Sequence, residues 1–132
     1  MKEENVLNKY MESNILTATP EKLILMLYNG CIKNIHLAKK SIEENDIVNK
    51  NNFILKAESI VFELQASLDF NYPISKEINS LYEFIIDLLI DANINKDSSK
   101  LDAALKLVLE FRDTWEQAMK INQANVKTTK AG

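Results

Sequence analysis

Side chains that could carry catalysis or bind a metal ion are scarce in this sequence. It contains one cysteine, Cys31, and one histidine, His36. A di-iron centre in a helical bundle needs Glu-x-x-His pairs on facing helices, and the residue three before His36 is Lys33. Such a centre therefore cannot be built here, and we expect His36 to be a surface or partly buried polar residue.

Nucleophilic catalysis is not supported by the pattern either. Cys31 falls on the arc of its segment that would face a helical core, where a thiol behaves as a small hydrophobe. A reactive cysteine would need a nearby base and an electropositive setting. The sequence has no glycine-rich loop to cradle a phosphate, and its carboxylates are spaced with lysines as on solvated helix faces. We therefore expect no enzyme, no metal site and no cofactor.

Length and charge narrow the class of protein further. The chain has 132 residues, enough for one domain with its own core. The net charge is −3 and Arg112 is the only arginine, which argues against nucleic-acid binding because that binding draws on clustered Lys and Arg. The N-terminus shows no signal-peptide pattern, and the apolar run Leu23 to Tyr28 is too short to span a bilayer. With a single cysteine, the composition favours a cytoplasmic protein without membrane insertion.

The elements that must position these residues are helices. Two glycines and two prolines leave little material for the tight turns of a β protein. Thr19 followed by Pro20 suits a helix start, because proline favours extended dihedrals before it and itself fits the first helical position. Apolar residues recur every three or four positions in four segments, 20–45, 49–68, 75–92 and 99–122.

Short joints between these segments predict an all-α fold, an antiparallel up-and-down four-helix bundle with an N-terminal arm or short extra helix. Residues 1–16 form the predicted arm, residues 17–122 the bundle and residues 123–132 a disordered polar tail. One arc of the first helix is expected to face the core, and it consists of Ile24, Leu27, Tyr28, Cys31, Ile35, Ala38 and Ile42.

The first helix carries more apolar surface than one core stripe requires. It is either the most buried member of the bundle or the border of a groove for a partner. Apolar residues that lie off the main stripes of the other helices favour the groove, and they are Phe62, Phe84, Ile86, Ile90, Leu107 and Leu109. Gly30 costs about 1 kcal/mol in a helix interior relative to alanine. We expect another helix or a bound peptide to approach its backbone.

Four motifs in register resemble one known family. TATPEKLILMLYNGCIKNIHLA is similar to the first core helix of the flagellar export chaperone FliS family, with its Ala-Thr/Ser-Pro step and Leu-Tyr-Asp/Asn-Gly segment. KAESIVFELQASLDF, LYEFIIDLLIDANINKD and FRDTWEQA follow in the same order. The resemblance covers essentially residues 10–120. It implies a small helical bundle that binds the disordered C-terminal region of flagellin in the cytoplasm, prevents premature polymerisation and keeps flagellin competent for flagellar type III export.

The resemblance also implies partners and contact residues. The export gate and other flagellar regulators are further expected partners, and the alternative function is a regulatory module that binds another flagellar protein such as a sigma-factor inhibitor. The expected flagellin contacts are Leu23, Met26, Leu27, Gly30 and Ile32. In this family the arm is thought to lie over the client surface when no client is present. Tyr10, Ile15 and Leu16 are the residues expected to form that lid, the alternative being that they are a permanent piece of core.

Two positions depart from the family pattern, and one matching stretch is assigned to structure. Asp87 and Leu88 stand where many members carry an Arg-Arg pair, and the segment 71–73 stands in place of a Gly-Gly before the third helix. Trp115, in the family's Arg-Asp-x-Trp stretch, is expected to be a buried core ring. Arg112, next to Asp113 in that stretch, is expected to make a structural ion pair, the alternative being a contact with the client.

Overall fold

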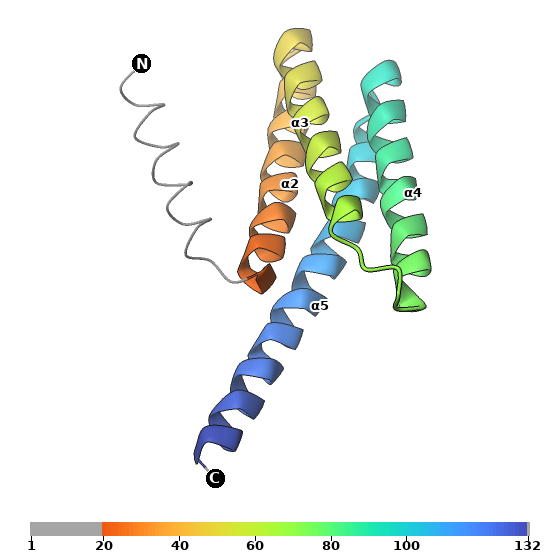
Figure 1. Ribbon diagram of the computed structural model, residues 1–132. Helices are drawn as coiled ribbons and strands as arrows, with labels where there is room; N and C mark the ends of the chain where they lie inside the picture. The colour runs from red at the N-terminus through yellow and green to blue at the C-terminus, as the bar shows by residue number, and fades with distance from the viewer. Residues whose placement is uncertain (1–19, 132) are drawn as a thin grey trace, which may run out of the picture.

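Four helices follow one another along the part of the chain that the structure describes. The structure is a computed structural model that describes the backbone of residues 20–131 and the side chains of residues 20–124. The helices are α2 (Pro20–Glu43), α3 (Ile47–Ala66), α4 (Ile74–Asn95) and α5 (Ser98–Ala131). Each helix packs against two others, in the cyclic order α2, α3, α4, α5 (Figure 1). The predicted four-helix bundle is confirmed, whereas the predicted arm lies outside the described residues.

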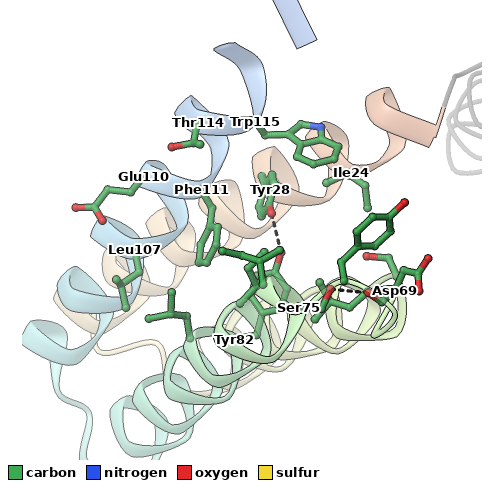
Figure 2. Close-up of a pocket in the computed structure, with 16 residues that line it drawn as sticks. Ile24, Tyr28, Asp69, Ser75, Tyr82, Leu107, Glu110, Phe111, Thr114 and Trp115 are labelled. Carbon is green, nitrogen blue, oxygen red and sulfur yellow. Dashed lines mark hydrogen bonds between the residues drawn. The ribbon is translucent and has the colours of Figure 1, made fainter. Parts of the chain in front are cut away.

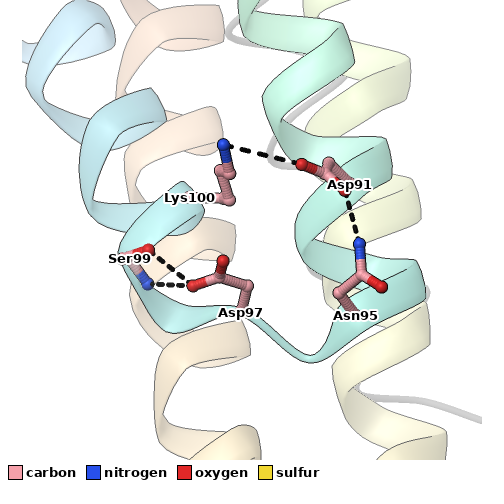
Figure 3. Close-up of polar contacts among 5 residues, drawn as sticks. All are labelled: Asp91, Asn95, Asp97, Ser99 and Lys100. Carbon is pink, nitrogen blue, oxygen red and sulfur yellow. Dashed lines mark hydrogen bonds and ion pairs between the residues drawn. The ribbon is translucent and has the colours of Figure 1, made fainter.

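Local chemistry explains where the helices end. Asn45 takes a left-handed φ of 55°, and the Asp46 side chain then accepts a hydrogen bond from the Asn49 backbone N–H, which caps α3. Lys96 likewise takes a left-handed φ, of 52°, directly after the end of α4. The carboxylate of Asp97 next accepts hydrogen bonds from the backbone N–H and hydroxyl of Ser99, as Figure 3 shows. The helix ends differ from the predicted ones by a few residues, because capping residues of this kind set the exact position at which a helix begins or ends.

The last helix is longer than the sequence pattern predicts. We expected a disordered polar tail from residue 123, but the backbone of α5 stays helical to Ala131. Figure 1 shows the C-terminal part of α5 projecting beyond the other three helices. An apolar stripe is not required there, because alanine, lysine and glutamine favour helix through their intrinsic propensity and the segment continues an existing helix.

The core lies between all four helices. Of the predicted arc of α2, Tyr28, Cys31, Ile35 and Ala38 are buried. The other three members of that arc pack against the core in partly buried positions, and they are Ile24, Leu27 and Ile42. The largest fully buried side chains elsewhere are Ile54, Val61, Leu64, Ile85, Leu89, Leu101 and Val108. Helical periodicity therefore identified the core-facing stripe of α2 correctly.

Polar contacts join the helices at the end of the bundle away from Pro20. The Lys50 ammonium, on α3, donates a hydrogen bond of 2.8 Å to the backbone carbonyl of Asn93 on α4. Lys100 of α5 lies 3.6 Å from a carboxylate oxygen of Asp91 on α4 (Figure 3). Polar contacts therefore hold the helices together at this end, and the apolar grooves lie toward the other end of the bundle.

Candidate functional site

A groove runs between the first half of α2 and the second half of α3. We call it the α2–α3 groove; it has a volume of about 940 Å³. It is lined by Pro20, Glu21, Leu23, Ile24, Met26, Leu27, Gly30, Lys33, Asn34, Ile60, Glu63, Ser67 and Trp115. Leu23, Met26, Leu27 and Gly30, four of the residues singled out from sequence, therefore lie together along one open surface.

Gly30 lines this groove without a side chain. A Cβ atom at this position would lie 3.3 Å from Cδ1 of Ile60, which reaches across from α3. The missing side chain therefore lets α3 approach α2 closely and also leaves the backbone of α2 accessible from the groove. Of the two alternatives predicted for Gly30, the structure shows the approach of a neighbouring helix, through Ile60, and the bound peptide stays a prediction.

Ile32 does not belong to this groove. Its side chain is only 8 % exposed and forms part of the core. The sequence placed Ile32 on an arc of the helix away from the core stripe, but α2 has neighbours on two sides, α3 and α5, and Ile32 is buried. Tyr10, Ile15 and Leu16, the predicted lid, lie outside the described residues.

A second groove opens where α2, α4 and α5 meet the α3–α4 connection. We call it the α4–α5 groove; its volume is about 810 Å³. It is lined by Ile24, Tyr28, Ser67, Leu68, Asp69, Tyr72, Ile74, Ser75, Ile78, Leu81, Tyr82, Leu107, Glu110, Phe111, Thr114 and Trp115, drawn in Figure 2. Several of its apolar side chains are open to solvent, since Tyr72 is 64 %, Ile74 59 % and Leu81 42 % exposed.

Three aromatic rings form the wall of the α4–α5 groove. The ring of Phe111 stacks on that of Tyr28, with centroids 5.9 Å apart and 7° between the planes. It also leans on Tyr82, at 5.1 Å and 42°. The hydroxyls of the two tyrosines are 2.7 Å apart and share a hydrogen bond (Figure 2). Burial raises the pKa of both phenols, so both hydroxyls keep their protons at neutral pH.

Trp115 joins the two grooves. The residue was predicted to be a buried core ring, and this prediction was wrong: the side chain is partly exposed and packs against the outside of the core. Its indole N–H donates a 2.8 Å hydrogen bond to the backbone carbonyl of Glu21 in the first turn of α2. Trp115, Ile24 and Ser67 line both grooves, so the two surfaces meet along this ring.

The charged residues at the two grooves are mostly acidic. Asp69 and Glu110 are the charged residues that line the α4–α5 groove. Glu21, Glu63 and Lys33 are those of the α2–α3 groove. A segment with apolar side chains toward the protein and basic groups at its edges would match this arrangement.

Other chemistry-bearing residues serve the fold. Cys31 is fully buried, and burial raises the pKa of its thiol to about 12, which makes it a poor nucleophile. His36 lies on the surface. Arg112 bonds to the carboxylate of its neighbour Asp113 at 2.9 Å, as the expected ion pair. Within residues 20–124 no group of three or more His, Cys, Asp or Glu side chains is placed to hold a metal ion.

Sequence reasoning missed the α4–α5 groove. Leu107, Phe111 and Trp115 recur every four residues, and we expected Trp115 to be a buried core ring. The same spacing could have indicated a groove. These three side chains would need a neighbouring helix to cover them, and the predicted helix 49–68 ends at the break formed by residues 69–73. Among the departures from the family pattern, Leu88 is buried whereas Asp87 is exposed, so only the charge of Asp87 alters the surface.

No described helix combines the length and the apolar character needed to cross a bilayer. Comparison with known proteins gives a consistent result. The model of the family described as "Flagellar protein FliS" matches residues 3–122. The chain is 39 % identical over 116 residues to the flagellar secretion chaperone FliS of Bacillus subtilis, covering 88 % of this chain and 87 % of that protein. It is 31 % identical over 108 residues to the flagellar secretion chaperone FliSB of Pseudomonas aeruginosa, covering 80 % and 86 %.

A solved structure shows the same fold. It is described as the crystal structure of a flagellar chaperone from bacteria, with a TM-score of 0.72. The match covers 89 % of this chain and 98 % of the other. Because the two sequences are only 19 % identical, the match supports the fold and nothing further.

Proposed function

This chain belongs to the FliS family of flagellar secretion chaperones, and we propose that it binds the disordered C-terminal region of flagellin in the cytoplasm. Binding would keep flagellin from polymerising before export and hold it competent for the flagellar type III apparatus. The observation that carries the proposal is the pair of apolar grooves that meet at Trp115.

The shape of the grooves suits a polypeptide segment. One is lined by α2 and α3 and the other by α2, α4 and α5, so that a ligand occupying both must extend across several helices. An amphipathic segment that folds as it binds can lay its apolar side into such grooves. Each partner thereby covers apolar surface that would otherwise promote aggregation of the other.

The mechanism is stoichiometric burial. Flagellin's own terminal helices would be held in the grooves and could not pair with other flagellin chains. Ordering a disordered segment opposes binding, and burial of apolar area must outweigh that cost. Release then needs only another partner that competes for the same surface, such as the export gate.

Titration calorimetry of the full chain with a flagellin C-terminal peptide tests the proposal. We expect one peptide per chain and a clearly negative heat-capacity change, because apolar surface is buried. Met26→Asp should weaken binding about tenfold or more, since it places a charge in the α2–α3 groove, where Met26 is 37 % exposed.

Ile94→Asp is the matched control. Ile94 is 74 % exposed and lines neither groove, so the same change should leave the affinity unaltered. Absence of both heat and comigration with the unmodified chain would overturn the proposal. Equal weakening by the two substitutions would place the binding surface elsewhere.

A further inference from the structure

Two buried phenols meet in the wall of the α4–α5 groove. Tyr28 comes from α2 and Tyr82 from α4, and both side chains line the groove although they are only 4 % and 3 % exposed. Figure 2 shows their hydroxyls pointing toward each other among the lining residues. The O–O distance is 2.7 Å, and either oxygen can be the donor.

Counting hydrogens shows that this pair is incomplete. Each phenol carries one O–H, and the contact between the two oxygens uses one of the two protons. Among the described residues, neither Tyr28 nor Tyr82 makes another side-chain hydrogen bond. One O–H therefore remains to be donated. Buried polar groups are nearly always hydrogen-bonded, so this donor calls for an acceptor at the groove.

The pair is held in position for that role. Phe111 stacks on Tyr28 and leans on Tyr82, which fixes the direction of both rings. Rigid donors lose little conformational entropy when a ligand arrives. The spare O–H therefore lies on one of two oxygens whose rings are held in place.

Charge limits the kind of acceptor. The charged side chains that line this groove, Asp69 and Glu110, are both acidic. A carboxylate brought to the tyrosines would lose its hydration and face two like charges. A neutral oxygen pays a smaller desolvation cost, which the hydrogen bond offsets, and it is not repelled by the two carboxylates.

We infer that Tyr28 and Tyr82 together select the client segment of the α4–α5 groove, by donating their remaining O–H to a neutral side-chain oxygen on its apolar face. The acceptor is the amide oxygen of Asn or Gln or the hydroxyl of Ser or Thr. In a helical segment the backbone carbonyls are bonded within the helix, which leaves the side chain as acceptor. A wholly apolar segment would leave the donor unpaired and bind more weakly. This inference rests on the proposed function and names a determinant of client specificity.

The test is a double-mutant cycle between the tyrosines and the client. In Tyr28→Phe/Tyr82→Phe both hydroxyls are removed and the ring shapes are kept, so no polar group is left unpaired and the urea midpoint should hardly move. The full chain and this variant are titrated with a flagellin C-terminal peptide and with peptides in which single Asn, Gln, Ser or Thr residues are replaced by alanine. Loss of the hydroxyls should weaken binding of the unmodified peptide about five- to tenfold.

One peptide position should be coupled to the tyrosines. Its replacement weakens binding to the full chain by a similar factor and has no further effect on the double variant. Ser80→Ala is the control, because it removes an exposed hydroxyl that lines neither groove and donates to the Lys76 carbonyl of its own helix. Its affinity should stay within about twofold of the unmodified chain.

The outcomes separate the two ideas. If the unmodified chain binds but every peptide position acts additively with the tyrosine changes, the inference is overturned and the proposed function stands. A fall in the urea midpoint with unchanged affinity also overturns it, since the hydroxyls would then serve only the fold. If the unmodified chain does not bind the peptide at all, the proposed function fails and the inference with it.

Discussion

The indole N–H of Trp115 donates a 2.8 Å hydrogen bond to the backbone carbonyl of Glu21, which ties the middle of α5 to the first turn of α2. The bond connects residues 94 positions apart in the sequence. It holds the ring at the place where both grooves meet.

Trp115 should report client binding directly. It is the only tryptophan, so intrinsic fluorescence excited at the indole band comes from the junction of the grooves. Covering the partly exposed ring with apolar client side chains should shift the emission to shorter wavelength. Titration with a flagellin C-terminal peptide measures the shift, and an unchanged spectrum at saturation by calorimetry would show that the client avoids this junction.

Trp115→Phe should lower the free energy of unfolding by about 1 kcal/mol, because an aromatic ring, though a smaller one, is kept and the hydrogen bond to Glu21 is lost. Urea unfolding followed by circular dichroism gives this value. A loss of several kcal/mol would instead mean that the indole acts as a core residue.

Gly30→Ala should raise the free energy of unfolding by about 0.5–1 kcal/mol, since alanine favours helix over glycine. The new Cβ would approach Cδ1 of Ile60 to 3.3 Å, and the end of a flexible side chain can yield by a few tenths of an ångström. Thermal or urea unfolding measures the change. A drop in stability would show that Ile60 is held too firmly to move.

Stability should fall at alkaline pH in part because of Cys31. Burial raises the pKa of this thiol from 9.0 to about 12, so between these values the unfolded chain releases a proton that the folded chain keeps. The contribution is complete below about pH 9 and is lost as the pH rises toward 12, by up to about 1.4 kcal/mol per pH unit.

Cys31→Ala removes the pH-dependent contribution of the thiol to stability. The difference in unfolding free energy between the two proteins should be constant from pH 7 to about pH 9 and should shrink above it, while the tyrosines contribute equally to both. Urea titrations at stepped pH test this. A constant difference up to pH 11 would mean that the thiol titrates normally in the folded protein.

We also propose that residues 1–16 act as a lid that flagellin displaces, with Ile15 and Leu16 as its apolar contacts. Ile15→Ser/Leu16→Ser in the full chain should then leave the affinity for the flagellin peptide unchanged or increase it severalfold, because an internal competitor is weakened. Calorimetry gives the affinity and urea unfolding the stability. A large loss of stability would identify these residues as permanent core instead.

Much of the fold could be read from local pattern. The Thr19–Pro20 step predicted the start of α2 correctly, since the dihedral preferences of proline act on neighbouring residues alone. The core arc of α2 followed from a period of 3.6 residues, which places Cys31 and Ile35 on one side whatever the neighbour is. Four of five expected contact residues lie along one groove for the same reason.

Tertiary packing decided the rest. Ile32 is buried and Trp115 partly exposed, because exposure depends on which helix lies opposite and how far it extends. The α4–α5 groove likewise arises from three helices and a connection that come together only in the fold. Periodicity assigned Tyr28 to the core arc of α2, but it could not show that its hydroxyl would meet that of Tyr82, 54 residues away, at 2.7 Å. The sequence by itself determined which faces are apolar, and the tertiary structure decided which of those faces remain open, because that depends on contacts distant in the chain.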